Sequence, residues 1–561
     1  LSLKSSIDRW RALPPESEQE AAELASVIQT QAQELDLIAE DAHWNGDASA
    51  NIHQLAEDVA ELENTLIPYG LHIVGEPPHA EQRAEMLGAM AEARELTQPP
   101  QATLDAITAG KSVQEAMTEG DMARDETARK QLEELAKVDR QMATDSETSA
   151  ILHALDGRFV RPAPGGDLVR TPEVLPTGRN IHGFDPYRLP STFAVHDGKR
   201  QAEELLRRYD SDKQTVPETV ALVLWGTDNL KTEGAAIAQA LALIGARPRF
   251  DSFNRLAGAE LIPLEEMDRP RIDVIVTLSG IFRDLLPLQT RMLAEAAYLA
   301  AEADEPTEWN YVRKNTLAYQ ESQDCDFETA ALRVFSNAEG AYGSNVNQLI
   351  ENGRWSDENE LAEAYNKRKC FAYGRSGSPV QKSELLNTML GNVELAYQNL
   401  DSAELGVTTI DHYFDTLGGI SRAITRSRGD NVPVYIGDQT KGKNRVRSLS
   451  EQVALETRTR SLNPKWYESM LEHGYEGVRQ IEAHITNTMG WSATTGQVAP
   501  WVYKQLSQTF ALDPERFVRA RGEELRIVAA GREQTRDHRL LHPPVAPARR
   551  AADSPVRGAT P

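Results

Sequence analysis

One histidine lies among two aspartates and two glycines in the run from Asp411 through His412 and Asp415 to Gly418 and Gly419. Carboxylates are preferred ligands of hard cations such as Mg2+, and a carboxylate or an imidazole can accept a proton. The three-residue spacing of His412 and Asp415 predicts that both lie on one face of a helix. We therefore treat His412, Asp415 and Asp411 as candidate catalytic residues, with His412 and Asp415 as candidate metal ligands. The residues alone favour a simpler alternative, a helix start capped by Asp411 with His412 on the surface.

A glycine-rich stretch could supply side chains for a binding site. Between residues 333 and 345 polar groups alternate with glycines, a pattern typical of a loop that lines a pocket. A purely structural turn explains the same residues equally well. The side chains that could contact a bound molecule are Asn337, Glu339, Tyr342 and Asn345.

Two further pairs of a histidine and an acid have simpler explanations. His182 and Asp185 repeat the three-residue spacing in a loop, where an ordinary Asp-Pro turn is favoured. His473 and Glu476 adjoin a glycine that would end a helix, which favours a structural role for this pair. We keep His182 and Asp185 as candidate binding residues.

Residues 437–444 resemble a phosphate-binding loop, because they read G-x-x-x-x-G-K-N after a strand-like run and before an expected helix. The last position is Asn444, whereas the motif requires a Ser or Thr hydroxyl for Mg2+. No convincing acidic partner stands out at a strand end. Nucleotide binding by this loop is therefore the less favoured hypothesis.

The elements that would position these residues are buried strands that alternate with helices. Residues 219–225 and 272–278 are continuous apolar runs typical of buried strands, and residues 234–243 predict a helix. This alternation predicts a parallel sheet, whose ligands bind beyond the carboxyl ends of the strands. One such end carries Arg283, which we include among the candidate binding residues.

We predict an α/β protein with a parallel-sheet core, large helical regions and an N-terminal helical segment. The expected segments are a helical segment (1–150), a loop-rich connector (151–216), an α/β parallel-sheet domain (217–324), a mixed helix-rich domain with the candidate site motifs (325–514) and an atypical tail (515–561). The tail contains ten Arg and no Lys, a composition that predicts disorder.

The composition narrows the possible settings and partners. A net charge of -25 over 561 residues argues against nucleic acid or an anionic membrane as the main partner. Cys325 and Cys370 are too few for a disulfide framework or a Cys-based zinc site, which favours a reducing, cytoplasmic setting. No stretch reaches the apolar length of a membrane span. The chain begins at Leu1 without an initiating Met, so we expect a segment of a longer protein.

Long runs of the sequence resemble the large subunits of the magnesium chelatase and cobaltochelatase family. The runs are PTGRNIHGFDPYRLPS (176–191), LWGTDNLKTEG (224–234), TLSGIFRDLLP (277–287), RVFSNAEGAYGSNVNQLI (333–350), TTIDHYFDTLGGISRA (408–423), SLSEQVALETRTRSLNPKWYESMLEHGYEGVRQIEAH (448–484) and NTMGWSATTGQVAPWVY (487–503). They extend over about residues 152–514, and the preceding helical region is also compatible with the family. The tail does not resemble the C-terminus of the family, and the N-terminal half of the family, with its His-Gly-Ser-x-Glu-type motif, has no counterpart in this sequence.

The resemblance implies the porphyrin-binding catalytic subunit of a magnesium chelatase, with Mg2+ and protoporphyrin IX as substrates in (bacterio)chlorophyll biosynthesis. It also implies that AAA+ partner subunits hydrolyse ATP. Magnesium is favoured over cobalt because His412 and Asp415 are features of the magnesium enzymes, and the resemblance places both in the active site. The alternatives are a non-catalytic tetrapyrrole-binding or sensor protein, a cobaltochelatase-like subunit and a P-loop nucleotide enzyme.

Overall fold

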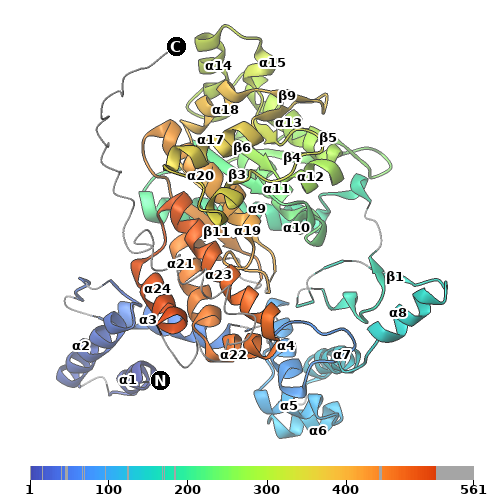
Figure 1. Ribbon diagram of the computed structural model, residues 1–561, viewed down its shortest axis with the longest axis vertical. Helices are drawn as coiled ribbons and strands as arrows, with labels where there is room; N and C mark the ends of the chain where they lie inside the picture. The colour runs from blue at the N-terminus through green and yellow to red at the C-terminus, as the bar shows by residue number, and fades with distance from the viewer. Residues whose placement is uncertain are drawn as a thin grey trace, which may run out of the picture.

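The computed structural model describes residues 2–512 apart from 15–16, 40, 45–47, 66, 68–69, 95, 123–124, 164, 167, 170, 182–184, 403 and 441–444. The predicted tail, residues 515–561, therefore lies outside the described residues. Within the described part, a helical N-terminal segment lies below a larger α/β core in the view of Figure 1.

The core is built on an eight-stranded sheet that is mostly parallel. Its strands, in spatial order, are β12 (Arg445–Ser448), β11 (Val434–Asp438), β10 (Leu395–Leu400), β3 (Thr219–Leu224), β6 (Asp273–Leu278), β7 (Val334–Ser336), β8 (Phe371–Tyr373) and β9 (Pro379–Gln381). The five strands from β11 to β7 pair in parallel, and β12, β8 and β9 are antiparallel to their neighbours. The predicted parallel-sheet α/β core is confirmed.

Helices cover both faces of this sheet, which explains the continuous apolar runs of β3 and β6. Alternate residues of β3 belong to two separate hydrophobic clusters, with Leu222 in one and Val223 in the other. The first cluster includes α9 (Thr192–Lys213), α11 (Ala235–Ile244) and α13 (Pro287–Glu302). The second includes α16 (Val346–Glu351), α17 (Glu358–Lys369), α18 (Ser383–Leu390), α20 (Gly419–Arg428), α21 (Leu449–Glu456), α23 (Gly474–Thr495) and α24 (Pro500–Leu506).

Shorter elements connect these layers. The remaining α-helices after residue 156 are α10 (Gly226–Lys231), α12 (Gly280–Leu285), α14 (Tyr311–Gln323), α15 (Phe327–Ala330), α19 (Asp411–Tyr413) and α22 (Pro464–Glu472). The described chain also contains the π-helices η4 (Phe414–Gly418), η5 (Thr457–Ser461) and η6 (Ser507–Ala511) and the 3-10 turns η1 (Pro172–Val174), η2 (Pro186–Arg188) and η3 (Leu264–Glu266). Two small sheets pair β1 (Pro162–Ala163) with β2 (Asn180–Ile181) and β4 (Ala246–Phe250) with β5 (Leu256–Leu261). None of the helices in the described part of the chain is long and apolar enough to cross a membrane.

The sheet joins two segments that the sequence analysis placed in different domains. β3 and β6 come from residues 217–324, whereas the other six strands come from residues 325–514. β10 returns to pair with β3 after the chain has passed through β6, β7, β8 and β9. A boundary at 324/325 therefore runs through one sheet, because strands distant in sequence complete each other's backbone hydrogen bonds.

The connector and the phosphate-loop context also differ from expectation. Residues 151–216 contain α9, a helix of 22 residues that packs on α11, so the loop-rich part ends at Ser191. Ser191 begins this helix by accepting a hydrogen bond from the Ala194 N–H. The helix expected after residues 437–444 is instead β12, which forms an antiparallel hairpin with β11.

The N-terminal segment is helical, as predicted, in its described part. Its described helices are α1 (Ser2–Arg11), α2 (Glu18–Glu34), α3 (Ser49–Asn64), α4 (Ala80–Ala93), α5 (Gln101–Thr108), α6 (Val113–Glu119), α7 (Glu126–Met142) and α8 (Glu147–Leu155). They build two small cores of their own, one within α1, α2 and α3 and the other within α4, α5, α6 and α7. Because these cores are small, contacts with the C-terminal helices must hold the segment in place.

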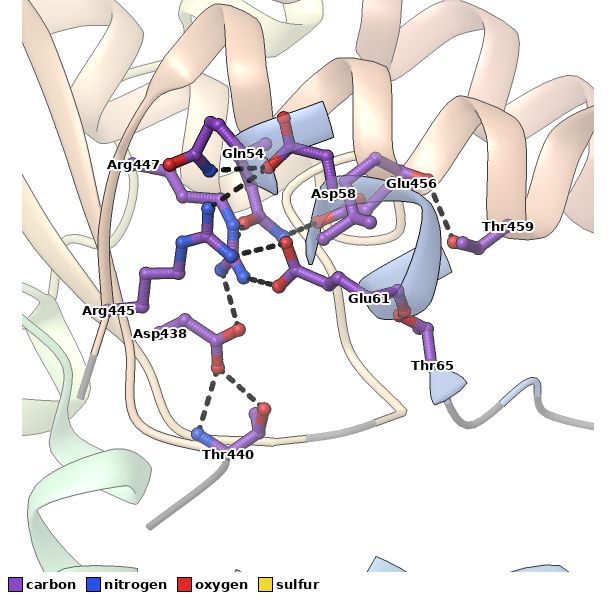
Figure 2. Close-up of polar contacts among 12 residues, drawn as sticks. Gln54, Asp58, Glu61, Thr65, Asp438, Thr440, Arg445, Arg447, Glu456 and Thr459 are labelled. Carbon is purple, nitrogen blue, oxygen red and sulfur yellow. Dashed lines mark hydrogen bonds and ion pairs between the residues drawn. The ribbon is translucent and has the colours of Figure 1, made fainter. Parts of the chain in front are cut away.

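Polar contacts supply this attachment at the edge of the sheet. Figure 2 shows Arg445 and Arg447 of β12 reaching Glu61 of α3, with 2.6 Å between Arg445 Nη1 and Glu61 Oε2. Arg447 also pairs with Asp438 of β11 at 2.7 Å, and Asp438 accepts hydrogen bonds from Thr440. Asp438, the second residue of the run 437–444, is therefore engaged with Arg447, which in turn contacts α3.

Candidate active site

The loops that follow β3 and β6 are packed against each other with no spare room. Ser279 begins α12 and its hydroxyl accepts hydrogen bonds from the Phe282 N–H and the Gly226 N–H. A Cβ on Gly226 would lie 2.7 Å from the Phe282 nitrogen, and one on Gly280 would lie 2.4 Å from the ring of Tyr342. Glycine at both positions lets the strand-end loops and the glycine-rich loop after β7 meet at one edge of the sheet.

Arg283 organises the glycine-rich loop. Its side chain is buried, and Nη1 donates to the backbone oxygens of Asn337, Ala338 and Ala341 at 3.3, 2.7 and 3.0 Å. The Asn337 side chain donates to Gly343 O at 2.7 Å. The structure thus brings together Arg283 and Asn337, two of the candidate binding residues, and the hydrogen bonds that they make here shape the loop itself.

Tyr342 and Glu339 are the exposed candidate binding residues of this loop. The Arg283 guanidinium lies 5.4 Å from the centre of the Tyr342 ring, and the Tyr342 hydroxyl donates to Asp284. Just over half of the Tyr342 surface is exposed, so one side of a flat aromatic ring remains available to a ligand. Asn345 has a positive φ of 65° and precedes α16, where it sets the direction of the helix.

Asp415 is fully buried and anchors the start of α16. We call Asp415 and the start of α16 together the hub. The Asp415 carboxylate accepts hydrogen bonds from the Ser344, Val346 and Asn347 N–H groups at 2.6, 2.8 and 3.1 Å, and from the Ser344 hydroxyl at 2.8 Å. Lys369 is nearby: burial lowers its pKa to about 8, and the Asp415 carboxylate opposes this shift. The hub therefore uses the carboxylate to fix two elements to each other.

His412 lies on the surface, unlike Asp415. The His412 side chain is 64% exposed, whereas Asp415 is 0% exposed. The prediction that both lie on one helix face is wrong, because the chain changes from α-helix to the π-helix η4 between them. A π-helix has wider turns, so residues three apart separate further around the axis. The glycines of the run approach other helices, since a Cβ on Gly418 would meet Thr494.

His412, Asp411 and Glu482 all act electrostatically on Glu351, and we call these four residues the rim. Asp411 lies 3.8 Å from the His412 ring and accepts a hydrogen bond from Asn347 Nδ2 at 2.7 Å. Burial raises the pKa of Glu351, and the negative charges of Asp411 and Glu482 raise it further, while His412 lowers it. Asp411 begins α19 and does not cap it, since Ile410 is in the cap position. The rim thus combines an accessible imidazole with a surplus of negative charge.

Of Asp185 and His182, the last two candidate binding residues, only Asp185 is among the described residues. Asp185 is exposed, accepts a hydrogen bond from the Tyr187 N–H and begins the turn η2, as an Asp-Pro turn would. His182 lies outside the described residues. Among the residues that the structure describes, no three His, Cys, Asp or Glu side chains come together in a way that could hold a metal ion.

Comparison with known proteins identifies the class to which this fold and rim belong. The family model described as CobN/Magnesium Chelatase matches residues 1–529, and the chain belongs to this family. The match includes the helical N-terminal segment and the first residues of the tail, so the family resemblance extends beyond residues 152–514 on both sides.

The similar proteins include both magnesium and cobalt enzymes. The chain is 54% identical over 532 residues to a magnesium-chelatase subunit of Rhodobacter capsulatus, covering 94% of this chain and 40% of the relative. It is 53% identical to the corresponding magnesium-chelatase subunit of Cereibacter sphaeroides, covering 91% and 39%. The chain thus spans about two fifths of the length of these two curated relatives. The catalytic subunit of cobaltochelatase from Mycobacterium tuberculosis has a TM-score of 0.88 and 29% identity, covering 97% of this chain and 50% of that one.

Proposed function

We propose that the chain forms part of the porphyrin-binding catalytic subunit of a magnesium chelatase, which inserts Mg2+ into protoporphyrin IX. The observation that carries the proposal is the 54% identity to the Rhodobacter capsulatus magnesium-chelatase subunit over 94% of the chain. The lower identity of 29% to the cobaltochelatase subunit makes the cobalt alternative the weaker one.

The rim suits the chemistry of this reaction. Two pyrrole N–H protons leave the macrocycle as Mg2+ enters, so accessible bases must lie beside the ring. His412 and the carboxylate of Asp411 can each take up a proton, and both are accessible. The negative charge of Asp411, Glu351 and Glu482 would attract the hydrated cation.

The hub and the Arg283 loop would position the rim and the substrate. Asp415 holds the start of α16, and α16 carries Asn347 and Glu351 next to Asp411. We therefore assign Asp415 as a positioning residue rather than a direct metal ligand, because its oxygens are already taken by hydrogen bonds. The exposed ring of Tyr342 would stack on the macrocycle, with Asn337, Asn345 and Arg283 fixing the loop below it.

ATP hydrolysis is assigned to AAA+ partner subunits. The glycine-rich loop after β11 precedes an antiparallel strand, whereas a phosphate-binding loop precedes a helix. Asp438 is engaged with Arg447 and Thr440 in the contact that holds α3 (Figure 2). We infer a reducing, cytoplasmic setting, since Cys325 and Cys370 are both free.

A reconstitution experiment tests the proposal. The chain joined to the N-terminal half of the Rhodobacter capsulatus relative would be combined with AAA+ partners, Mg2+, ATP and deuteroporphyrin, and Mg-porphyrin fluorescence followed. We expect turnover with Mg2+ and much less with Co2+. Turnover with Co2+ alone would favour the cobalt alternative, and porphyrin binding without any metal insertion would favour a tetrapyrrole sensor. Tight binding of a fluorescent ATP analogue by the isolated chain would support the nucleotide enzyme.

A further inference from the structure

The sheet has a topological switch point between β3 and β10. From β3 the chain continues to β6 and β7 on one side, and it later returns to β10 and β11 on the other side. β3 and β10 are parallel neighbours, with Leu222 opposite Tyr397. Ligands of open α/β sheets bind beyond the carboxyl ends of the strands at such a point. The function proposed above uses the hub, the Arg283 loop and the rim, but it assigns no role to the acidic side chains that directly follow β3 and β10.

Two buried acidic side chains follow the ends of these two strands. Asp228 lies in α10 directly after β3 and is 7% exposed, and Asp401 comes directly after β10 and is 3% exposed. Both act on one phenol: the pKa of Tyr413 is raised well above its usual value by burial, then by the charges of Asp228 and Asp401. Because β3 and β10 are parallel neighbours, their carboxyl ends place Asp228 and Asp401 at the same edge of the sheet, and the ring of Tyr413 reaches this edge by packing against Trp225.

Buried polar atoms without a partner collect at the same place. Within the described residues, Asp228 Oδ2 and Gln398 Nε2 are buried and make no hydrogen bond. Gln398 is held in place by Trp225, whose Nε1 donates to Gln398 Oε1 at 3.1 Å, and the Trp225 ring lies 5.1 Å from that of Tyr413. A buried polar atom left without a hydrogen bond is destabilising. These atoms therefore indicate a bound species that the side chains themselves do not supply.

The carboxylate oxygens and the amide N–H group at this place suit a hard cation that retains part of its hydration shell. Mg2+ is commonly held by one or two carboxylates while it retains several waters. Asp228 and Asp401 would supply those carboxylates, and a water of the outer hydration shell would accept a hydrogen bond from Gln398 Nε2. A zinc-type site with three or more His, Cys, Asp or Glu ligands is not formed by the described residues.

We propose that Asp228 and Asp401 bind one partly hydrated Mg2+ at the switch point, where the metal is held before its insertion into the porphyrin. The choice of Mg2+ rests on the proposed function, which makes this ion the substrate. Without the metal, burial raises the pKa of Asp228, with Lys231 opposing the shift, which favours the protonated carboxyl group over the bare carboxylate. When the metal binds, any proton on the Asp228 carboxyl group leaves to solvent, and the carboxylate oxygen replaces one water of the hydrated ion, which also leaves to solvent; no oxidation state changes.

Electron paramagnetic resonance with Mn2+ as the probe tests this site in the full chain. Free hexaaqua Mn2+ would be titrated with wild-type protein, and bound Mn2+ would then be displaced with Mg2+. We expect one tight site that Asp228→Asn and Asp401→Asn each weaken at least about tenfold, since each change removes one charged ligand. Asp304→Asn is the charge-matched control, because Asp304 is fully exposed and should leave the site intact.

The melting temperature of each variant, measured with and without Mg2+, shows whether the variant folds and whether it binds the ion. Mg2+ should raise the melting temperature of the wild type and of Asp304→Asn, but leave that of folded Asp228→Asn unchanged. Unchanged Mn2+ affinity in both Asp228→Asn and Asp401→Asn would overturn the proposal, and so would loss of the site only in Asp411→Asn, which would place the cation at the rim. The proposed function is tested separately: wild-type turnover in the reconstituted enzyme would uphold it even if the switch-point variants bind Mn2+ normally.

Discussion

The hub and the rim meet in the short run from Asp411 to Asp415, but the protein uses them in opposite ways. Asp415 is completely buried and its carboxylate accepts four hydrogen bonds, whereas three residues earlier His412 has most of its side chain in solvent. A buried charge held by donors is costly to disturb, and an exposed imidazole can exchange protons freely. The comparison teaches that proximity in sequence does not make two polar residues partners in the same reaction.

The largest expected effect is the loss of stability in Asp415→Ala. The change leaves the N–H groups of Ser344, Val346 and Asn347 without their acceptor in a buried environment, which should cost about 3 kcal/mol or more of unfolding free energy. Urea denaturation followed by circular dichroism measures it. Asp304→Ala removes an equally charged but exposed side chain and should change stability little. A stable Asp415→Ala protein would contradict the role of the hub.

Replacing the exposed histidine should have the reverse result. His412→Ala should lower chelatase turnover about a hundredfold, the typical contribution of a general base, while the unfolding free energy changes by less than about 0.5 kcal/mol. Turnover of the reconstituted enzyme and urea denaturation of the chain are the two measurements. Porphyrin affinity should stay constant, because it depends mainly on buried ring surface. Normal turnover would remove His412 from the reaction.

A second histidine extends the comparison to pH. His484 is buried beside Trp466, with Thr408 within 3.2 Å of its ring, and burial followed by Arg460 lowers its pKa to about 3. Because the folded pKa is below the unfolded value of about 6.5, the neutral form stabilises the protein above pH 6.5. This stability is lost as the pH falls from 6.5 toward 3, by up to about 1.4 kcal/mol per pH unit.

Urea titrations between pH 7 and pH 4 would show the effect, and the matched variants identify its source. The fall of the unfolding free energy with decreasing pH should become shallower in His484→Gln, because glutamine cannot be protonated. His412→Gln is the matched control at an exposed histidine and should leave the curve unchanged. Equal slopes in wild type and His484→Gln would assign the acid sensitivity to other groups.

The parts of the fold that could be predicted from the sequence are those with a strong local pattern. β3 and β6 are uninterrupted apolar runs because helices cover both of their faces, and this pattern predicted the parallel sheet. β10 was missed because Gln398 and Asn399 give it a polar sequence, although both side chains are buried and Asn399 is hydrogen-bonded to Gln201 and Gln239 across the helical layer. Polar residues whose hydrogen-bond partners are distant in sequence leave no local pattern from which a buried strand could be predicted.

The same limit applies to the site. Asp411, His412 and Asp415 could be proposed because they are close in sequence, but their division into rim and hub depends on the π-helical turn and on the loop before α16. Glu351 and Glu482 join the rim from two other helices, and no spacing rule connects them with His412. Lys369 near the hub was missed for the same reason.

The smallest expected effect concerns Tyr342, whose ring and hydroxyl group can be tested separately. Tyr342 lies over buried Arg283 and exposes one face, while its hydroxyl donates to Asp284. Tyr342→Phe keeps the ring and loses one partly exposed hydrogen bond, so the unfolding free energy should fall by less than about 1 kcal/mol. Porphyrin affinity, measured by fluorescence quenching with deuteroporphyrin in the completed subunit, should change by less than about twofold. Tyr342→Ala removes the stacking surface as well, and we expect about fivefold weaker binding. Equal affinities of the Phe and Ala variants would show that the ring does not stack on the macrocycle, and the loop would then serve only to hold the hub in place.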